Sequence, residues 1–155
     1  MKQLLAIFFV IGSIDSMGQS IPNKANLIKV KGVTFSQVCN TLLDSGYVIE
    51  KKDDQLQTVT TEMREYTKSF NAAYRLIIRV KDSVAIIYST FSAPWWDPFT
   101  KNAAKTDRLW DNTRSFVIVD KKGKAKLNQM NAYPFERMMR IGRALGSDME
   151  FFVSE

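Results

Sequence analysis

Two segments of the chain carry apolar residues at the spacing of an amphipathic helix. In the first, Thr34 and Gln37 stand three residues apart, which is the arrangement of a capping box. Gly46 follows the segment as the residue type that ends helices in the left-handed conformation. The apolar positions of this predicted helix are Phe35, Val38, Cys39, Leu42 and Leu43.

The second segment lies near the C-terminus, between Pro134 and Gly146. Proline suits the first turn of a helix, where its missing N–H group has no partner to lose. We therefore predict a helix that begins at this proline and stops at Gly146. Its apolar face is formed by Phe135, Met138, Ile141, Gly142 and Leu145.

Between the helices the pattern changes to a period of two, which is typical of strands. Over residues 72–81, Arg75 and Arg79 alternate with an apolar set that faces the other way: Tyr74, Leu76, Ile78 and Val80. A turn at residues 81–83 leads into a strand over 84–91, and three residues are expected to continue the apolar face: Val84, Ile86 and Tyr88. Other strands are predicted at residues 27–31, 47–51, 56–62, 114–119 and 149–153.

Alternation on one side of a strand indicates a sheet with one face on a core and the other toward water. The two amphipathic helices need an apolar surface, and such a sheet offers one. We therefore predict an α+β fold, an antiparallel sheet of about five to six strands with two helices packed on one face. Asp120 and Gly123, at the first and fourth positions of a tetrapeptide, predict a type I turn.

The order of these elements resembles the helix-grip or TATA-binding-protein-like arrangement. The resemblance is carried by residues 28–35, a strand, a glycine and a capped helix, and by residues 46–50, where the next strand follows Gly46. This arrangement occurs in small exported bacterial domains of unknown function and in envelope assembly proteins. A resemblance of topology implies the fold and no particular activity.

Residues 1–18 have the pattern of a cleavable export signal. Lys2 supplies a positive charge, residues 4–14 are mostly apolar, and Ser16 and Gly18 are small residues before the expected cleavage. The apolar run is about half the ~20 residues that a membrane-spanning helix needs. We expect a single mature domain over residues 19–155, secreted or periplasmic, with no membrane span.

Cys39 is the one cysteine of the chain. It lies far from the expected cleavage point, where a lipid-anchored bacterial protein would carry its cysteine, so we expect no lipid anchor. One cysteine also permits no intramolecular disulfide. Its position in the apolar stripe of the first helix predicts that the thiol packs as a small hydrophobic group.

The chain contains no histidine, which excludes catalysis by Ser-His-Asp or Cys-His groups and histidine-based metal sites. It also lacks a glycine-rich phosphate loop and an acidic calcium loop, so we expect no cofactor or metal. The remaining catalytic chemistry is that of paired carboxylates. Candidates are Glu62, Glu65, Asp97, Asp107 and Asp111.

Residues 92–112 show no periodicity and predict a long loop of the kind that is often functional. All three tryptophans of the chain lie in it, and tryptophan is common at binding hot spots. Such rings can equally fold back to cover the core. The candidate binding residues are Trp95, Trp96, Asp97, Phe99, Arg108, Trp110 and Arg114.

The loop overlaps a basic segment, residues 101–126, with eight lysines and arginines against three aspartates. Such a segment favours an anionic partner, or is a solvated surface. Our hypothesis is a non-enzymatic envelope module that binds a partner protein or an anionic envelope component through residues 93–114. The alternative is a carbohydrate-binding or carboxylate-dependent carbohydrate-active domain. Nucleic acid is not an expected partner, because of the compartment and because the predicted sheet lacks an aromatic stacking face.

Overall fold

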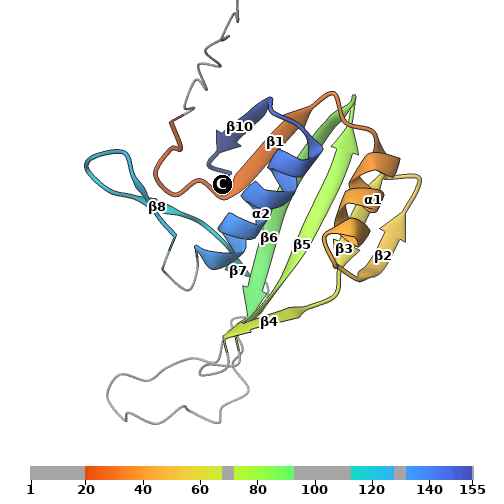
Figure 1. Cartoon of the computed structure of the whole chain (residues 1–155), viewed down its shortest axis with the longest axis horizontal. Coiled ribbons are helices and arrows are strands. Elements are labelled where there is room, and N and C mark those ends of the chain that lie inside the picture. Colours follow the sequence, from red (N-terminus) through yellow and green to blue (C-terminus); the bar gives the residue numbers. More distant parts are fainter. Residues whose placement is uncertain (1–19, 68–71, 93–112, 128–131, 155) are drawn as a thin grey trace, which may run out of the picture.

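A computed structural model describes residues 20–67, 72–92, 113–127 and 132–154. These residues form two helices on one face of an antiparallel sheet, which confirms the predicted α+β fold (Figure 1). The helices are α1 (Phe35–Asp44) and α2 (Tyr133–Leu145). The strands of the sheet are β1 (Leu27–Lys31), β2 (Ile49–Asp53), β3 (Thr58–Thr61), β4 (Arg64–Thr67), β5 (Ala72–Lys81), β6 (Val84–Ser92), β7 (Thr113–Arg114) and β10 (Met149–Phe152).

The sheet runs in the order β10-β1-β6-β5-β3-β2, while β4 pairs with β5 and β7 pairs with β6. A separate hairpin joins β8 (Ile118–Val119) to β9 (Ala125–Lys126). The strand predicted over residues 114–119 is therefore divided between β7 and β8. The turn predicted after it is confirmed, because the Gly123 N–H donates to the Asp120 carbonyl oxygen at 3.0 Å.

Helix α1 has the predicted capping box at its start and a Schellman motif at its end. The Thr34 side chain accepts from the Gln37 N–H, and the Gln37 side chain accepts from the Thr34 N–H. At the other end, the N–H groups of Gly46 and Tyr47 donate to the carbonyl oxygens of Leu43 and Leu42. Gly46 adopts a φ of +76°, which glycine reaches without strain. This motif turns the chain sharply and directs it into the sheet.

Helix α2 lies across β1, β6 and β5 and also contacts α1. It spans the predicted residues, with Pro134 in its first turn and Gly146 after its last residue. Its apolar face closes the core together with inward-facing residues of the sheet. The largest fully buried side chains include Ile28, Leu42, Tyr74, Leu76, Ile78, Ile87, Phe135 and Met138.

Strand β5 has the predicted bounds and the predicted buried face. The prediction for its hairpin partner β6 is wrong at three residues, which lie on the opposite face: Val84, Ile86 and Tyr88. Asp82 and Ser83 form a two-residue turn with φ values of +51° and +58°, so that Val80 pairs directly with Ala85. Paired residues share a face of the sheet, and β6 therefore buries Ala85, Ile87, Ser89 and Phe91.

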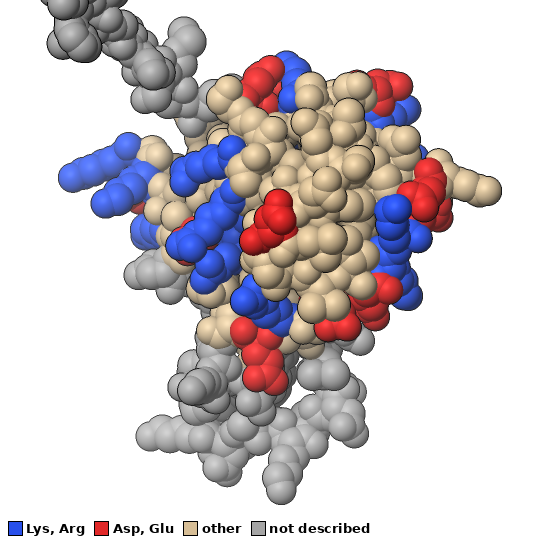
Figure 2. All heavy atoms as spheres, turned by 45° about the vertical axis from the view of Figure 1, so that its right-hand side comes forward, with Lys and Arg blue, Asp and Glu red and all other residues tan. Residues whose placement is uncertain are grey.

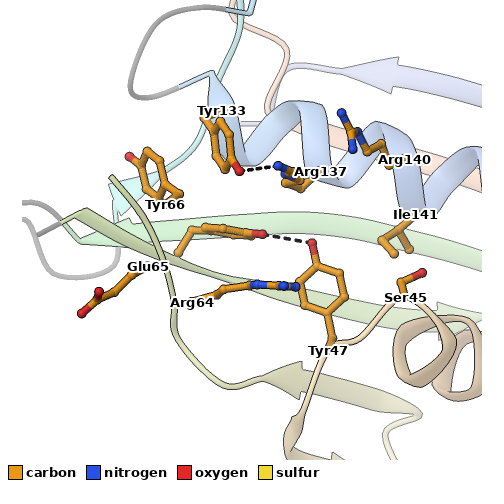
Figure 3. Close-up of a pocket in the computed structure, with 10 residues that line it drawn as sticks. Ser45, Tyr47, Arg64, Glu65, Tyr66, Tyr133, Arg137, Arg140 and Ile141 are labelled. Atoms are coloured by element: carbon orange, nitrogen blue, oxygen red, sulfur yellow. Dashed lines mark hydrogen bonds between the residues drawn. The ribbon is translucent and has the colours of Figure 1, made fainter. Parts of the chain in front are cut away.

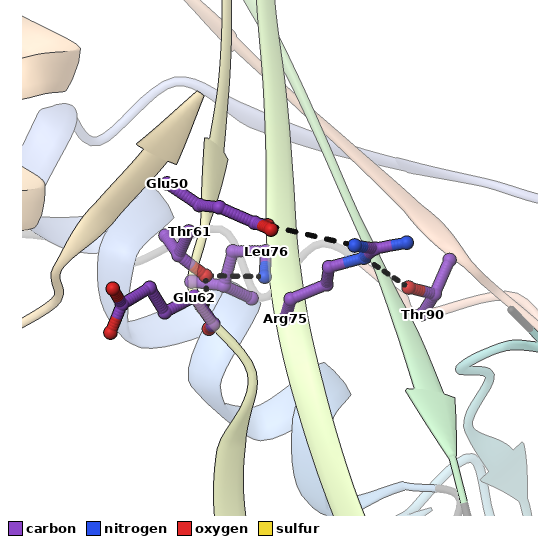
Figure 4. A network of polar contacts seen from close by, with 6 residues as sticks. All are labelled: Glu50, Thr61, Glu62, Arg75, Leu76 and Thr90. Atoms are coloured by element: carbon purple, nitrogen blue, oxygen red, sulfur yellow. Dashed lines mark hydrogen bonds and ion pairs between the residues drawn. The ribbon is translucent and has the colours of Figure 1, made fainter. Parts of the chain in front are cut away.

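Strand β4 was not expected from the sequence, and a single threonine marks where it departs from β3. Thr61 is buried, and its hydroxyl accepts from the Leu76 N–H at 3.0 Å and donates to the Glu62 carbonyl oxygen at 3.1 Å (Figure 4). The side chain thus replaces a backbone partner of β5 where β3 ends. The chain then rejoins β5 at Arg64, which pairs with Tyr74.

The face of the sheet away from the helices carries polar contacts across strands. Arg75 donates to the Thr90 hydroxyl at 3.4 Å and lies 3.6 Å from a Glu50 carboxyl oxygen (Figure 4). This places Arg75 on the face opposite Tyr74, as the alternation of β5 predicts.

Candidate functional site

A cavity of about 630 Å³ lies between the end of α1, β4, β5 and α2. It falls within the ~300–1,000 Å³ range that is common for ligand sites. Its lining is dominated by tyrosine and arginine (Figure 3). We call the following seven residues the tyrosine–arginine pocket: Tyr47, Tyr66, Tyr74, Tyr133, Arg64, Arg137 and Arg140.

Each side chain reaches the pocket for a local reason. Tyr47 follows the Schellman motif of α1, and Tyr74 belongs to the inward-facing set of β5. Arg64 and Tyr66 stand two residues apart on β4, so they project from the same face of that strand. The remaining residues stand on one face of α2, because they are spaced by three or four positions: Tyr133, Arg137 and Arg140.

The four tyrosines form a connected aromatic group. The rings of Tyr66 and Tyr133 are stacked, with centroids 4.8 Å apart and planes 8° apart. Tyr74 meets both rings edge to face, at 5.7 and 6.0 Å. Its hydroxyl is hydrogen-bonded to the Tyr47 hydroxyl at 3.0 Å, and both rings are buried. Contacts of this kind fix the orientation of the rings.

Two arginines are held against tyrosine rings. The Arg137 guanidinium lies 4.6 Å from the Tyr133 ring centroid and donates to the hydroxyl of the same residue. The Arg64 guanidinium lies 5.3 Å from the Tyr47 centroid, beside that ring in Figure 3. Stacking on an aromatic face orders the guanidinium before any ligand arrives.

Carboxylates do not balance these charges within the described part of the chain. Arg140 pairs with Glu136 at 2.7 Å, whereas neither Arg64 nor Arg137 forms a salt bridge with a described residue. Glu65 is the one acidic residue in the lining, and its carboxyl group points away from the arginines (Figure 3). The described lining therefore carries a net positive charge.

The buried hydroxyls stay protonated at neutral pH. Burial raises the pKa of Tyr66 to about 12, with a smaller effect from Tyr133. Burial, together with the hydrogen bond to Tyr47, raises the pKa of Tyr74 well above its ordinary value. Both groups remain neutral hydrogen-bonding groups rather than becoming tyrosinates that would cancel the arginine charge.

The predicted binding residues lie mostly outside the described residues: Trp95, Trp96, Asp97, Phe99, Arg108 and Trp110. Arg114 is described, and it is not part of the tyrosine–arginine pocket. Its guanidinium lies 5.3 Å from the Tyr88 centroid, on the face of the sheet away from the helices, and donates to the Ser154 hydroxyl.

The candidate carboxylates are not paired in the described structure. Asp97, Asp107 and Asp111 lie outside the described residues. Glu62 is exposed and does not line the pocket, whereas Glu65 does. The lining therefore offers one described carboxylate, whereas a glycosidase mechanism needs two. The described residues also contain no cluster of His, Cys, Asp and Glu side chains that could hold a metal ion.

The described part of the basic segment forms a second positive region. Its exposed lysines stand on or beside the β8–β9 hairpin: Lys121, Lys122, Lys124 and Lys126. Basic side chains gather on this side of the molecule, while the centre of the face in Figure 2 is largely uncharged. Asp120 is engaged locally, because its carboxylate accepts from the N–H groups of Lys122 and Lys124, which lowers its pKa.

Two further predictions concern Cys39 and the membrane. Cys39 is buried on the inner face of α1, which confirms its packing role, and this burial raises the pKa of its thiol. Neither helix of the described residues combines the length and the apolarity that crossing a bilayer requires. Residues 1–18, the predicted export signal, lie outside the described residues.

Sequence reasoning did not find the tyrosine–arginine pocket, because its residues come from four separate segments. One local signal was present. Tyr133, Arg137 and Arg140 recur at helical spacing beside the apolar face of α2, where a plain solvated surface has no need of a tyrosine. No protein-family model matches the chain, and no curated protein matches its sequence.

Proposed function

We propose that this protein is an exported, non-enzymatic binding module that holds an anionic ligand in the tyrosine–arginine pocket. One observation carries the proposal. Arg64 and Arg137 are ordered on tyrosine rings at the wall of a cavity, and no described carboxylate pairs with either. Export is inferred from residues 1–18 and is part of the same proposal.

Charge and geometry both favour an anion. The five N–H donors of a guanidinium match the oxygens of carboxylates, phosphates and sulfates. In the pocket, the guanidinium of Arg137 is only partly exposed, so its attraction for an anion is less screened than that of a surface lysine. Stacking also reduces the rotational freedom that the arginine loses on binding.

The loop expected over residues 93–112 remains a candidate for contacting a larger partner. Its described neighbours lie at the pocket end of the sheet, because Phe91 pairs with both Tyr74 and Thr113. A partner protein that carries the anionic group would bring it to the pocket at this end of the sheet. This retains the envelope-partner hypothesis as a part of the proposal.

Titration calorimetry on the mature domain tests the proposal. The probes are citrate, inorganic phosphate and sulfate, with glucose as the neutral comparison. We expect at least one anion to bind and glucose not to bind. Arg137→Gln, which removes the charge and keeps a polar side chain, should weaken that binding at least tenfold.

Arg79→Gln is the matched control, since Arg79 is exposed on the opposite face of β5. It removes the same charge at a distance from the pocket and should leave the affinity within about twofold. Equal losses in the two variants would show that the protein attracts anions only through its net charge. Binding of none of the anions would contradict the proposal.

A further inference from the structure

The hydrogen-bonding groups of the tyrosine–arginine pocket are mostly donors. Arginine side chains only donate. The Tyr133 hydroxyl accepts from Arg137, and its own proton has no acceptor among the described residues. Tyr47 and Tyr74 share one hydrogen bond, which uses one of their two hydroxyl protons. The pocket therefore supplies more donors than its described acceptors can satisfy.

One donor is buried without a partner. The Nε atom of Arg137 is buried and makes no hydrogen bond to a described residue. A buried donor left unpaired costs about 1–3 kcal/mol, and orphaned groups of this kind are rare in folded proteins. This Nε is closed to the cavity, so a ligand meets the other donors of the arginines, and their excess over the described acceptors favours a ligand rich in acceptor oxygens.

The donors approach the cavity from different sides. Arg64 comes from β4, Arg137 comes from α2, and the Tyr47 hydroxyl stands between them (Figure 3). A carboxylate presents its two oxygens in one plane, which suits one guanidinium. A phosphate or sulfate group presents three terminal oxygens in a pyramid, which can accept from several directions at once.

The cavity is also larger than an inorganic anion needs. Its volume of about 630 Å³ leaves room for an organic group. The stacked rings of Tyr66 and Tyr133 give one end of the lining an apolar character (Figure 3). Rings of this kind bind flat organic groups by stacking or by edge contacts.

We propose that the ligand is a phosphate or sulfate ester, with the oxyanion between Arg64 and Arg137 and its organic group against the Tyr66–Tyr133 pair. This inference rests on the proposed function, since it names the class of anion that the same pocket takes. Both ester types share the tetrahedral oxyanion. They differ in charge, because a phosphate monoester carries close to two negative charges at neutral pH and a sulfate monoester carries one.

Binding of three matched probes tests the inference: 4-nitrophenyl phosphate, 4-nitrophenyl sulfate and 4-nitrobenzoate. They share the ring and differ in the anionic group. We expect one of the two esters to bind at least tenfold more tightly than the benzoate. Inorganic phosphate or sulfate should bind more weakly than its ester, because it lacks the ring. The stronger of the two esters identifies the natural oxyanion.

Two variants test the binding of the oxyanion and of the organic group separately. Arg64→Gln should weaken the ester at least tenfold. Tyr66→Leu should weaken the ester severalfold and leave inorganic phosphate or sulfate within twofold. Circular dichroism confirms that each variant is folded before it is titrated.

The outcomes distinguish this inference from the proposed function. If the benzoate binds as tightly as the esters, or more tightly, the pocket is a general anion site and the ester inference is overturned while the proposed function stands. If none of these anions binds, both are overturned. If Tyr66→Leu weakens the inorganic ion as much as the ester, the tyrosine pair does not hold the organic group.

Discussion

Two faces of α2 make opposite kinds of contact. On one face, Gly142 lies so close to the strands that an added Cβ would come within 2.8 Å of the Met149 sulfur and 3.6 Å of Ile28 and Val30. On the other face, Tyr133 and Arg137 border an open cavity. The first face packs directly on the sheet because glycine has no side chain, whereas the large side chains of the second face line open space.

The difference shows how one helix can provide both stability and a binding site. Close packing excludes ligands and stabilises the fold, because dispersion contacts are lost wherever a gap opens. The side chains that line the cavity lack those dispersion contacts, and they include arginines that the core does not need for its packing. The comparison predicts that substitutions on the packed face mainly change stability and substitutions on the cavity face mainly change binding.

The largest contrast is expected between two neighbouring residues of α2, Met138 and Arg137. Met138 is fully buried, so Met138→Ala should lower the free energy of unfolding by about 2–5 kcal/mol through the cavity it leaves. Arg137→Ala should lower the free energy of unfolding by about 1 kcal/mol or less, because a cation–π contact at a partly exposed site contributes no more than this. Urea unfolding followed by circular dichroism measures both, and similar losses would contradict the comparison.

An enlarged side chain should be tolerated where it borders the cavity and not where α2 packs on the sheet. Gly142→Leu should destabilise the protein by about 1–3 kcal/mol, because the new side chain meets Met149, Ile28 and Val30. Ser45 is exposed and lines the cavity, and Ser45→Leu should change stability by no more than about 0.5 kcal/mol. The measurement is the thermal midpoint. Equal shifts for the two variants would show that the cavity is not free space.

A smaller effect is expected from the paired hydroxyls at the floor of the pocket. Tyr74→Phe leaves the buried Tyr47 hydroxyl without its partner and should cost about 1 kcal/mol. Tyr47→Phe added to it removes the orphaned group, so the double variant should lose less than the sum of the two single variants. Strict additivity in urea unfolding would mean that the two hydroxyls do not interact.

The last effect is absent at neutral pH, because it is a loss of stability that begins only at alkaline pH. An unfolded tyrosine releases its proton near pH 10, whereas folded Tyr66 keeps its proton up to a pH of about 12. The unfolded state is therefore favoured as the pH rises from about 10 to 12. Tyr66→Phe should make this decline shallower than in the unmodified protein. Unfolding curves across the range measure it, and parallel declines would contradict the raised pKa of Tyr66.

The elements that could be predicted from the sequence are those with local causes. The capping box at Thr34, the glycines after both helices and the alternation of β5 depend on neighbouring residues, so α1, α2 and β5 lie where they were predicted. The face of β6 was mispredicted, because apolar residues occupy both faces of that strand. The two-residue turn at Asp82 and Ser83, rather than the apolar pattern, determines which face is buried.

Strand β4 and the pocket could not be predicted in this way. The segment Arg64–Thr67 has no apolar alternation. It pairs with β5 beyond the point where β3 stops and where the Thr61 hydroxyl accepts from the Leu76 N–H. The pocket then depends on β4, the end of α1, β5 and α2 meeting at one place. Such a meeting is a property of the tertiary fold, because no spacing along the chain encodes the contact between Tyr66 and Tyr133.

The pairing of β10 with β1 has a consequence for how the molecule is made. Asn26 and Ser154 exchange hydrogen bonds across the ends of these strands, although they stand 128 positions apart. A chain that emerges from its N-terminus onward therefore exposes one edge of β1 until the last strand is free. Non-local pairing of this kind is slow, and a bare strand edge can recruit a neighbouring chain. The sheet therefore reaches the width described here only after β10 has been made, and until then this edge of β1 is open to pairing with another chain.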